Sequence, residues 1–234
     1  MKVLVAIPTY NERENLTELV ERLLGLPVLV DILIVDDNSP DGTGQLADRL
    51  AADRPEQVFV IHRPAKSGLG TAYLDGFRWG LERGYQALCQ MDADGSHNPA
   101  DLPRLIGALE NGSDLAIGSR RVRGGRIVGW NAWRHLMSWG ANTISRLLLR
   151  LKTKDVTAGF RCLRADLVRR LLQAAPAAGG YAFQEETLFL AERGGARVIE
   201  LPVVFVDRRQ GASKLGQQEI KEFFRTVIKL TGRR

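Results

Sequence analysis

The amino-acid sequence predicts an α/β fold, in which a mostly parallel sheet carries helices on both faces. Short runs rich in β-branched residues alternate with amphipathic segments, as they do in consecutive βαβ units. Several runs, such as residues 32–35, are apolar throughout, which is typical of parallel strands that helices cover on both sides. Five strands are therefore expected, at residues 3–7, 32–35, 58–61, 87–91 and 115–117.

Polar residues directly follow four of these strands. They occupy positions 8–12, 36–39, 62–63 and 92–94. In an open parallel sheet the carboxyl ends of the strands lie at one edge, and the ligand crevice forms outside that edge. We therefore expect these acids and bases to gather there and to form the functional site.

The chain of 234 residues is expected to form one domain, residues 1–234, because it is long enough to bury a core. Its 44% hydrophobic and 26% charged residues are typical of a folded globular protein. Pro8 and a polar run interrupt the apolar start, which is therefore interpreted as a strand rather than a signal peptide. No apolar run approaches the roughly 20 residues that a membrane-spanning helix needs, so no such helix is expected.

The two cysteines, Cys89 and Cys162, lie far apart in the sequence and in apolar surroundings. They form no CxxC pair, so a zinc site is not indicated. We expect buried free thiols rather than a disulfide, which suits a reducing cytoplasm.

The positive charge is concentrated in one part of the chain. The net charge is +6, which attracts nucleic acid, acidic lipid or phosphorylated substrates without choosing among them. Residues 115–154 contain no Asp or Glu. The same stretch carries Arg120, Arg121, Arg123, Arg126, Arg134, Arg146, Arg150, Lys152 and Lys154.

Two amphipathic helices are predicted in the second half, at about residues 133–151 and 217–230. The apolar face of the first contains Trp133, Leu136, Met137, Ile144, Leu147, Leu148 and Leu151, opposite Arg134, Ser138, Asn142, Ser145 and Arg146. Such a face commonly covers a sheet. Basic flanks and the aromatic residues Trp130, Trp133 and Trp139 also fit a helix that lies in the headgroup region of a membrane. The sequence leaves both interpretations open.

The central chemical signal is the acidic pair Asp92 and Asp94, which follows the fourth predicted strand. Carboxylates spaced by one residue reach a common divalent cation, and Mg²⁺ or Mn²⁺ takes oxygen ligands completed by substrate phosphates and water. Such a pair also occurs in ordinary turns. Its place after an apolar strand favours a metal that binds a diphosphate.

Two other classes of nucleotide-binding fold place a glycine-rich phosphate loop directly after the first strand. Neither GxGxxG nor GxxxxGK[ST] follows Ile7. A dinucleotide oxidoreductase and a P-loop enzyme are therefore disfavoured. Metal and side chains are expected to hold the phosphates instead.

The chain resembles family 2 glycosyltransferases of GT-A fold in the motifs IPTYNE (7–12), VDDNSPDGT (35–43), DAD (92–94) and GSR (118–120). Within that family it resembles the dolichol- or polyprenol-phosphate mannose synthases in RPAKSGLGTA (63–72), MDADGSHNP (91–99), TAGFR (157–161), FQEE (183–186) and GASKL (211–215). These motifs span nearly the whole chain. The resemblance implies a Rossmann-like GT-A sheet with a nucleotide-sugar half, residues 1–119, and an acceptor half, residues 120–234.

The same resemblance implies a nucleotide pocket formed by Pro8, Tyr10, Glu12, Val35, Asp37, Lys66 and Ala93. A carboxylate at the end of the second strand suits ribose hydroxyls or guanine N–H groups. Outside the motif, Asp36 and Asp37 would be interpreted as turn residues before Pro40.

The resemblance also implies the catalytic and metal-binding residues. Asp94 and Ser96 are expected to bind the metal, and Asp92 to contact the metal or the diphosphate. Some relatives carry Gln in place of Ser96, so a water is expected beside the shorter hydroxyl. His97 is interpreted as a loop residue.

The resemblance also implies which side chains bind the phosphate groups. Arg120, Arg134 and Ser138 match positions that hold the acceptor phosphate and the donor diphosphate, and Arg120 is also expected to be catalytic. Arg209 and Lys214 lie on a terminal loop that resembles a lid. Guanidinium groups suit phosphate oxygens because they donate in a planar fork.

The implied activity is inverting transfer of mannose from GDP-mannose to dolichyl or polyprenyl phosphate. A phosphate monoester has a second pKa of about 6, so it is already anionic and needs no general base. Glu185 and Glu186 are therefore expected to position the site or to cap a helix.

Two alternatives differ from this activity. A family 2 transferase can use another nucleotide sugar, such as UDP-glucose, or a hydroxyl acceptor. A basic nucleic-acid-binding domain also fits the charge, but it leaves the carboxylates at the strand ends unexplained. No nucleic acid is therefore expected as a partner.

The expected location is the cytoplasmic face of a membrane. Many relatives add spanning helices after the catalytic domain, whereas this chain stops at Arg234. Peripheral association with the membrane surface is expected, with a small membrane-anchoring subunit as a further candidate partner.

Overall fold

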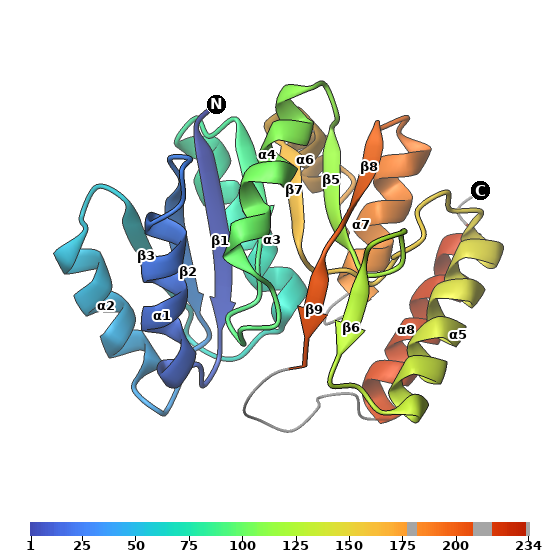
Figure 1. Ribbon diagram of the computed structural model, residues 1–234, viewed down its shortest axis with the longest axis horizontal. Helices are drawn as coiled ribbons and strands as arrows, with labels where there is room; N and C mark the ends of the chain where they lie inside the picture. The colour runs from blue at the N-terminus through green and yellow to red at the C-terminus, as the bar shows by residue number, and fades with distance from the viewer. Residues whose placement is uncertain (177–181, 208–216, 233–234) are drawn as a thin grey trace.

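The computed structural model describes residues 1–176, 182–207 and 217–232. Its first half alternates strands and helices along the chain (Figure 1). The elements are β1 (Val3–Thr9), α1 (Arg13–Leu24), β2 (Asp31–Asp36), α2 (Thr43–Asp53), β3 (Val58–His62), α3 (Leu69–Glu82), β4 (Ala87–Gln90), the 3₁₀ turn η1 (Pro99–Asp101), α4 (Leu102–Glu110) and β5 (Leu115–Ser119). All five predicted strands are confirmed.

The second half is less regular. Its elements are β6 (Arg126–Val128), α5 (Ala132–Leu149), β7 (Arg161–Arg164), α6 (Ala165–Gln173), α7 (Ala182–Arg193), β8 (Val198–Pro202), β9 (Val204–Val206) and α8 (Gln217–Thr231). Both predicted amphipathic helices are present as α5 and α8. The short strands β6 and β9 pair with each other in a small second sheet.

The main sheet has seven strands in the order β3-β2-β1-β4-β7-β5-β8. Neighbouring pairs are parallel except those of β7, which runs antiparallel between β4 and β5. The chain moves outward from β1 to β3 and then returns to place β4 on the other side of β1. In such a sheet this reversal opens a crevice outside the carboxyl ends of β1 and β4.

Helices cover both faces of the sheet, as predicted (Figure 1). One buried cluster joins the sheet to α1 and α4, through side chains such as Leu16 and Leu105. The other joins it to α3, α6 and α7, through side chains such as Phe77, Val168 and Leu188. The apolar strands predicted from the sequence therefore have apolar neighbours on both sides.

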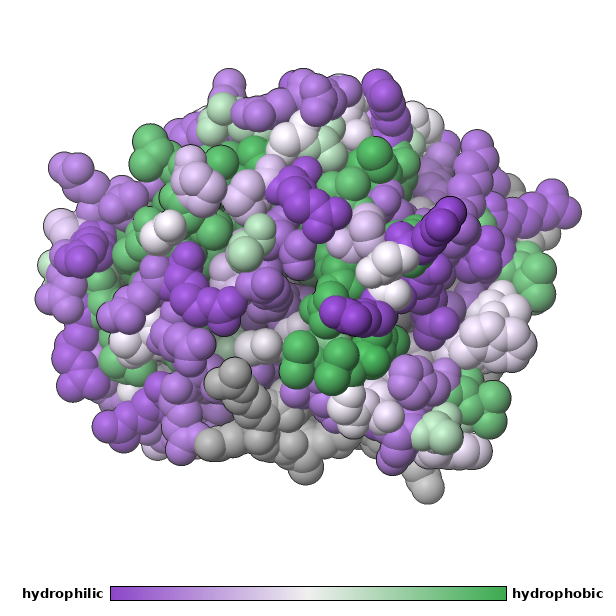
Figure 2. All heavy atoms as spheres, in the orientation of Figure 1, coloured by the Kyte–Doolittle hydropathy of each residue, from purple (hydrophilic) through white to green (hydrophobic). Residues whose placement is uncertain are grey.

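Helix α5 exposes most of its apolar face and buries its polar face, which is the reverse of the usual arrangement. Trp133 is 66% exposed, Leu136 56% and Leu147 72%, whereas Asn142 and Ser145 are buried. The interpretation that the apolar face of this helix covers the sheet is therefore wrong, because its polar face points inward. Apolar surface is visible along the right-hand edge in Figure 2, where Figure 1 places α5 and α8.

Helix α8 behaves differently from α5. Val227 and Leu230 are fully buried and belong to the core cluster of α3, α6 and α7. Ile228, between them, is largely exposed. The apolar side chains of this helix therefore lie partly against the core and partly at the surface. Within the described residues, no helix is long and apolar enough to span a bilayer.

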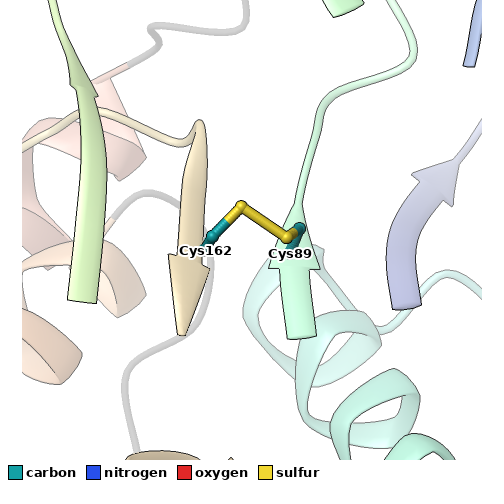
Figure 3. Close-up of a disulfide and its surroundings, with 2 residues drawn as sticks. All are labelled: Cys89 and Cys162. Atoms are coloured by element: carbon teal, nitrogen blue, oxygen red, sulfur yellow. A yellow bond between two sulfur atoms is a disulfide. The ribbon is translucent and has the colours of Figure 1, made fainter. Parts of the chain in front are cut away.

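The expectation of two free thiols is wrong. Cys89 and Cys162 form a disulfide between β4 and β7 (Figure 3). The two residues are directly opposite each other in the antiparallel register of these strands. The sequence did not reveal this pairing, because β7 enters the sheet 73 residues after β4 and in the opposite direction.

Candidate active site

The loops after β1, β2 and β3 meet at the carboxyl edge of the sheet. Asp37, after β2, accepts a hydrogen bond from Arg63 Nη1 at 2.6 Å and one from the Ser67 N–H at 3.3 Å. Burial raises the pKa of Asp37, and the nearby Arg63 opposes that rise. Arg63 is a buried partner whose role the sequence analysis did not identify. It ties a carboxylate of the expected nucleotide pocket to the loop that contains Lys66.

Other residues expected to bind the nucleotide also come together here. Pro8 and Val35 are opposite each other in the register of β1 and β2. The Lys66 ammonium lies 3.9 Å from the centre of the Tyr10 ring, a cation–π contact. Glu12 accepts a hydrogen bond from the Asn15 amide at 3.0 Å at the start of α1. The structure thus gathers side chains from the three loops after β1, β2 and β3 at one edge.

The acidic turn follows β4, one strand away. The Asp94 carboxylate accepts a hydrogen bond from the Ser96 N–H at 3.0 Å, which closes a tight turn. Gly95 supports this turn with a φ of 74°, a conformation that favours glycine. Asp92 Oδ1 accepts a hydrogen bond at 3.0 Å from the hydroxyl of Tyr73, a residue of α3 that the sequence analysis did not single out.

His97 lies in the loop after β4, as expected, and is part of the framework of this turn. It is buried and stacks on Phe160, with ring centres 5.2 Å apart. Its Nδ1 accepts a hydrogen bond from the backbone N–H of Asp92 at 3.3 Å. Burial lowers the pKa of His97, so a neutral ring supports the acidic turn.

The turn fits a divalent cation. Ser96 is only 2% exposed, and its hydroxyl oxygen has no hydrogen-bond partner. Asp92, Asp94 and this hydroxyl are oxygen donors of the kind that Mg²⁺ and Mn²⁺ accept. No three His, Cys, Asp or Glu side chains in the described part of the chain lie together so that they could hold a metal by themselves. Diphosphate oxygens and water are the usual additional ligands at a site with one or two carboxylates.

Arg120 follows β5 and is held by a residue that the sequence analysis missed. Asp155 is fully buried and accepts hydrogen bonds from Arg120 Nε at 2.8 Å, from Nη2 at 2.6 Å and from the Arg120 N–H at 2.8 Å. Burial opposes the ionised form of Asp155, but the Arg120 guanidinium keeps its pKa below the usual value. The sequence contains one indication of this partner, because Asp155 is the first acidic residue after the basic stretch of residues 115–154.

The inner face of α5 contacts this arginine region. Ser138 accepts a hydrogen bond from Arg121 Nη2 at 2.8 Å, and Arg134 pairs with Asp207. Asn142 accepts a hydrogen bond from the Val156 N–H at 2.8 Å, beside Asp155. Arg134 and Ser138 are thus near the site, as expected, although protein groups bind them in this structure. Arg209 and Lys214 lie outside the described residues.

A second buried polar group lies between β7 and α7. The guanidinium of Arg161 donates hydrogen bonds to the backbone carbonyls of Val156, Ala158 and Gln184, each at 2.8 Å. Glu185 accepts a hydrogen bond from Ser145 at 2.8 Å. Burial raises the pKa of Glu185 to about 8, against the opposing effects of Ser145 and Arg161. This shift favours the protonated form of Glu185 at neutral pH.

A model of glycosyl transferase family 2 matches residues 4–172. A polyprenol monophosphomannose synthase of Mycolicibacterium smegmatis is 50% identical over 222 residues, which are 94% of this chain and 83% of the relative. An undecaprenyl-phosphate mannosyltransferase of Micrococcus luteus is 50% identical over 92% of this chain and 88% of the relative. A dolichol-phosphate mannosyltransferase of Pyrococcus furiosus is 40% identical over 98% of this chain and 64% of the relative.

Solved structures show the same fold. Glucosyl-3-phosphoglycerate synthase from Mycobacterium tuberculosis, in complex with Mn²⁺, UDP-glucose and phosphoglyceric acid, aligns with a TM-score of 0.68. The alignment covers 99% of this chain and 80% of that chain at 18% identity. Another structure of that synthase, in complex with phosphoglyceric acid, aligns with a TM-score of 0.71. The predicted Rossmann-like GT-A fold is confirmed.

Proposed function

Because this chain belongs to glycosyl transferase family 2, we propose that it moves mannose from GDP-mannose to a polyprenyl phosphate such as dolichyl phosphate. The products are polyprenyl-phosphate mannose and GDP. The two relatives that are 50% identical are named a polyprenol monophosphomannose synthase and an undecaprenyl-phosphate mannosyltransferase, which supports mannose as the sugar and a polyprenyl phosphate as the acceptor. The structural observation that carries the proposal is the acidic turn after β4, where Asp92, Asp94 and the unpartnered Ser96 hydroxyl meet.

The reaction is a direct displacement at the anomeric carbon of the sugar. An oxygen of the acceptor phosphate forms the new bond from one side, while the bond to the β-phosphate oxygen of GDP breaks on the other side. GDP leaves with the electron pair, and the anomeric configuration inverts. The acceptor is already anionic at neutral pH, so no side chain needs to remove a proton.

The cofactor of this reaction is Mg²⁺ or Mn²⁺. Asp94 and Ser96 would hold it, and Asp92 would contact the metal or the diphosphate. When bound, the cation stabilises the negative charge that develops on the departing diphosphate. The neighbouring synthase structure, crystallised with Mn²⁺ and a nucleotide sugar, shares only the fold with this chain.

The other proposed roles divide between the two sides of the crevice. Tyr10, Asp37 and Lys66 bind the nucleoside, together with Pro8, Glu12, Val35 and Ala93. Arg120, Arg134 and Ser138 bind the phosphate groups. Here Arg120 is oriented by Asp155, so its position is set before substrate arrives.

The first experiment measures transfer of radiolabelled mannose from GDP-mannose to a short polyprenyl phosphate. Asp94→Ala is expected to lower kcat/KM at least a thousandfold, and EDTA is expected to abolish transfer by the wild type. Asp166→Ala is the matched control. Its carboxylate is 85% exposed at the start of α6, at the opposite edge of the sheet, so transfer should stay within twofold of the wild type.

A panel of nucleotide sugars in the same assay tests the donor. Turnover with UDP-glucose and none with GDP-mannose would refute the mannose assignment. Full activity of Asp94→Ala would refute the site. Mannose transfer that depends on metal and is lost in Asp94→Ala would support donor, acceptor and site together.

We further propose that the protein binds a membrane surface peripherally through the outer face of α5. This face exposes Trp133, Leu136, Met137, Trp139, Ile144, Leu147 and Leu148. The exposed Arg150 follows the helix directly, and acidic residues are absent from the helix. An apolar face with aromatic and basic residues at its border is typical of helices that lie in the interface plane of a bilayer.

Flotation with liposomes that contain acidic lipid tests this surface. Leu147→Asp is expected to weaken binding at least tenfold. Leu29→Asp is the matched control, because Leu29 is 87% exposed in the loop before β2, on the far side of the sheet from α5. If the wild type stays with the unbound fraction, or if both variants float alike, α5 is not the binding surface.

A further inference from the structure

Tyr73 makes a contact with the acidic turn that none of the motifs revealed. It lies in the first turns of α3 and is fully buried. Its hydroxyl donates a hydrogen bond to Asp92 Oδ1 at 3.0 Å. The contact joins a helix on one face of the sheet to the loop that follows β4.

Packing fixes the position of this hydroxyl. The Tyr73 ring stacks on Phe183 of α7, with ring centres 6.2 Å apart and planes within 14°. It also contacts Phe77, one turn further along α3, with ring centres 6.3 Å apart. A tyrosine held between two aromatic rings keeps few rotamers. Burial and the Asp92 charge also raise its pKa well above the usual value, so the hydroxyl remains a donor.

Two further contacts involve the backbone N–H and the second carboxylate oxygen of Asp92. Its backbone N–H donates to His97 Nδ1 at 3.3 Å. Gly159 approaches so closely that a Cβ there would lie 3.3 Å from Asp92 Oδ2. The carboxylate is therefore oriented by a hydroxyl at one oxygen and bordered by backbone at the other.

We propose that Tyr73 is a positioning residue that orients the Asp92 carboxylate for a divalent cation bound with the nucleoside diphosphate. This inference rests on the proposed function and extends it to a residue that contacts neither metal nor substrate. Hydrogen bonds to metal-binding side chains fix their orientation, and removing such a bond typically weakens metal affinity 10- to 100-fold. The ring of Tyr73 supports the fold, whereas its hydroxyl serves the site.

The test compares Tyr73→Phe with Tyr85→Phe. Tyr85 provides the matched control. It is also buried, and its hydroxyl donates a hydrogen bond to a carboxylate, Asp31 Oδ2, at 2.7 Å. Asp31 is the first residue of β2, at the opposite edge of the sheet. Both substitutions therefore remove one tyrosine–aspartate hydrogen bond and leave the ring in place.

Binding of Mn²⁺ in the presence of GDP is measured by electron paramagnetic resonance, which needs no catalysis. Tyr73→Phe is expected to raise the Kd for Mn²⁺ about tenfold or more, while Tyr85→Phe stays within twofold of the wild type. Equal affinities in Tyr73→Phe and the wild type would overturn the proposal. Equal losses in the two variants would overturn it as well, because they would indicate a general effect on stability.

A kinetic readout separates this inference from the proposed function. Raised Mn²⁺ concentration is expected to restore transfer by Tyr73→Phe, which shows a change in apparent metal affinity rather than in kcat. If the wild type binds Mn²⁺ and GDP but transfers no mannose, the substrate assignment fails and the Tyr73 result still stands. If transfer is normal and Tyr73→Phe binds Mn²⁺ normally, only the inference fails.

A second variant keeps the test decisive if Tyr73→Phe is poorly folded. Phe183→Leu keeps the hydroxyl but removes the ring that stacks on Tyr73. It is expected to weaken Mn²⁺ binding by a smaller factor in the same direction. Unchanged Mn²⁺ affinity in Phe183→Leu would then overturn the proposal.

Discussion

The helices α4 and α5 have similar amphipathic patterns but opposite orientations. In α4, Leu102, Leu105 and Leu109 are completely buried against the sheet. In α5 most of the apolar side chains are exposed, and the buried positions are Asn142, Ser145 and Leu149. The first half of the chain, residues 1–119, thus follows the usual rule of apolar faces inward. The second half departs from it where it meets the site.

The difference shows what an amphipathic pattern establishes. The pattern indicates that a helix has two unlike faces, but the neighbours determine which face is buried. The neighbours of α4 are apolar strands, whereas α5 lies beside polar groups such as the partly buried Arg121, the buried Glu185 and the Val156 backbone. Hydrogen bonds to those groups avoid the penalty of burying them unpaired.

The largest expected effect tests how firmly the two halves are joined. The disulfide between β4 and β7 closes a loop of 73 residues, and such a loop is expected to contribute about 4 kcal/mol to the free energy of unfolding. Urea unfolding of the oxidised protein, compared with Cys89→Ala/Cys162→Ala, measures that contribution. Dithiothreitol should weaken the wild type and leave the double variant unchanged. Two free thiols in the denatured, unreduced wild type would contradict the prediction.

A smaller effect compares α4 and α5 directly. Leu109→Ala removes a buried side chain and is expected to lower the free energy of unfolding by about 3 kcal/mol. Leu147→Ala removes an exposed side chain and is expected to change it by less than about 0.5 kcal/mol. Chemical denaturation of both variants measures the difference. Similar losses would show that α5 packs through its apolar face after all.

The last effect is a slope with pH rather than a single change in free energy, and it sharpens the comparison of what each half buries. Glu185 has a pKa of about 8 in the folded protein, raised by burial from an ordinary value of 4.5. Between these values the unfolded chain is ionised and the folded chain keeps the proton. Stability is therefore lost as pH rises through this range, at about 1 kcal/mol per pH unit. Glu185→Gln, measured by denaturation at pH 5 to 8, should remove that slope; an unchanged slope would contradict the assignment.

Much of the fold was predictable because the first half obeys local rules. Its five strands are apolar runs bounded by polar turns, and each proved to be a strand of the main sheet. The strand β7 was not predicted, because it is short and its place between β4 and β5 depends on contacts distant in sequence. The disulfide was missed for the same reason.

The candidate site was predictable where side chains follow strands directly. Asp37, Asp92 and Arg120 lie at strand ends, and the structure places each at the carboxyl edge. Residues that support them were missed, notably Tyr73 and Asp155, because they come from other elements and act through burial. A sequence pattern reveals chemistry at strand ends more readily than the packing behind it.

The inward polar face of α5 has a consequence for how substrates arrive. If its outer face rests on a bilayer, the lipid acceptor finds the site by lateral diffusion in the plane of the membrane. The nucleotide sugar arrives from the water on the other side. The two substrates then approach the site from different phases. The rate of encounter with the lipid depends on its density in the membrane rather than on its concentration in solution.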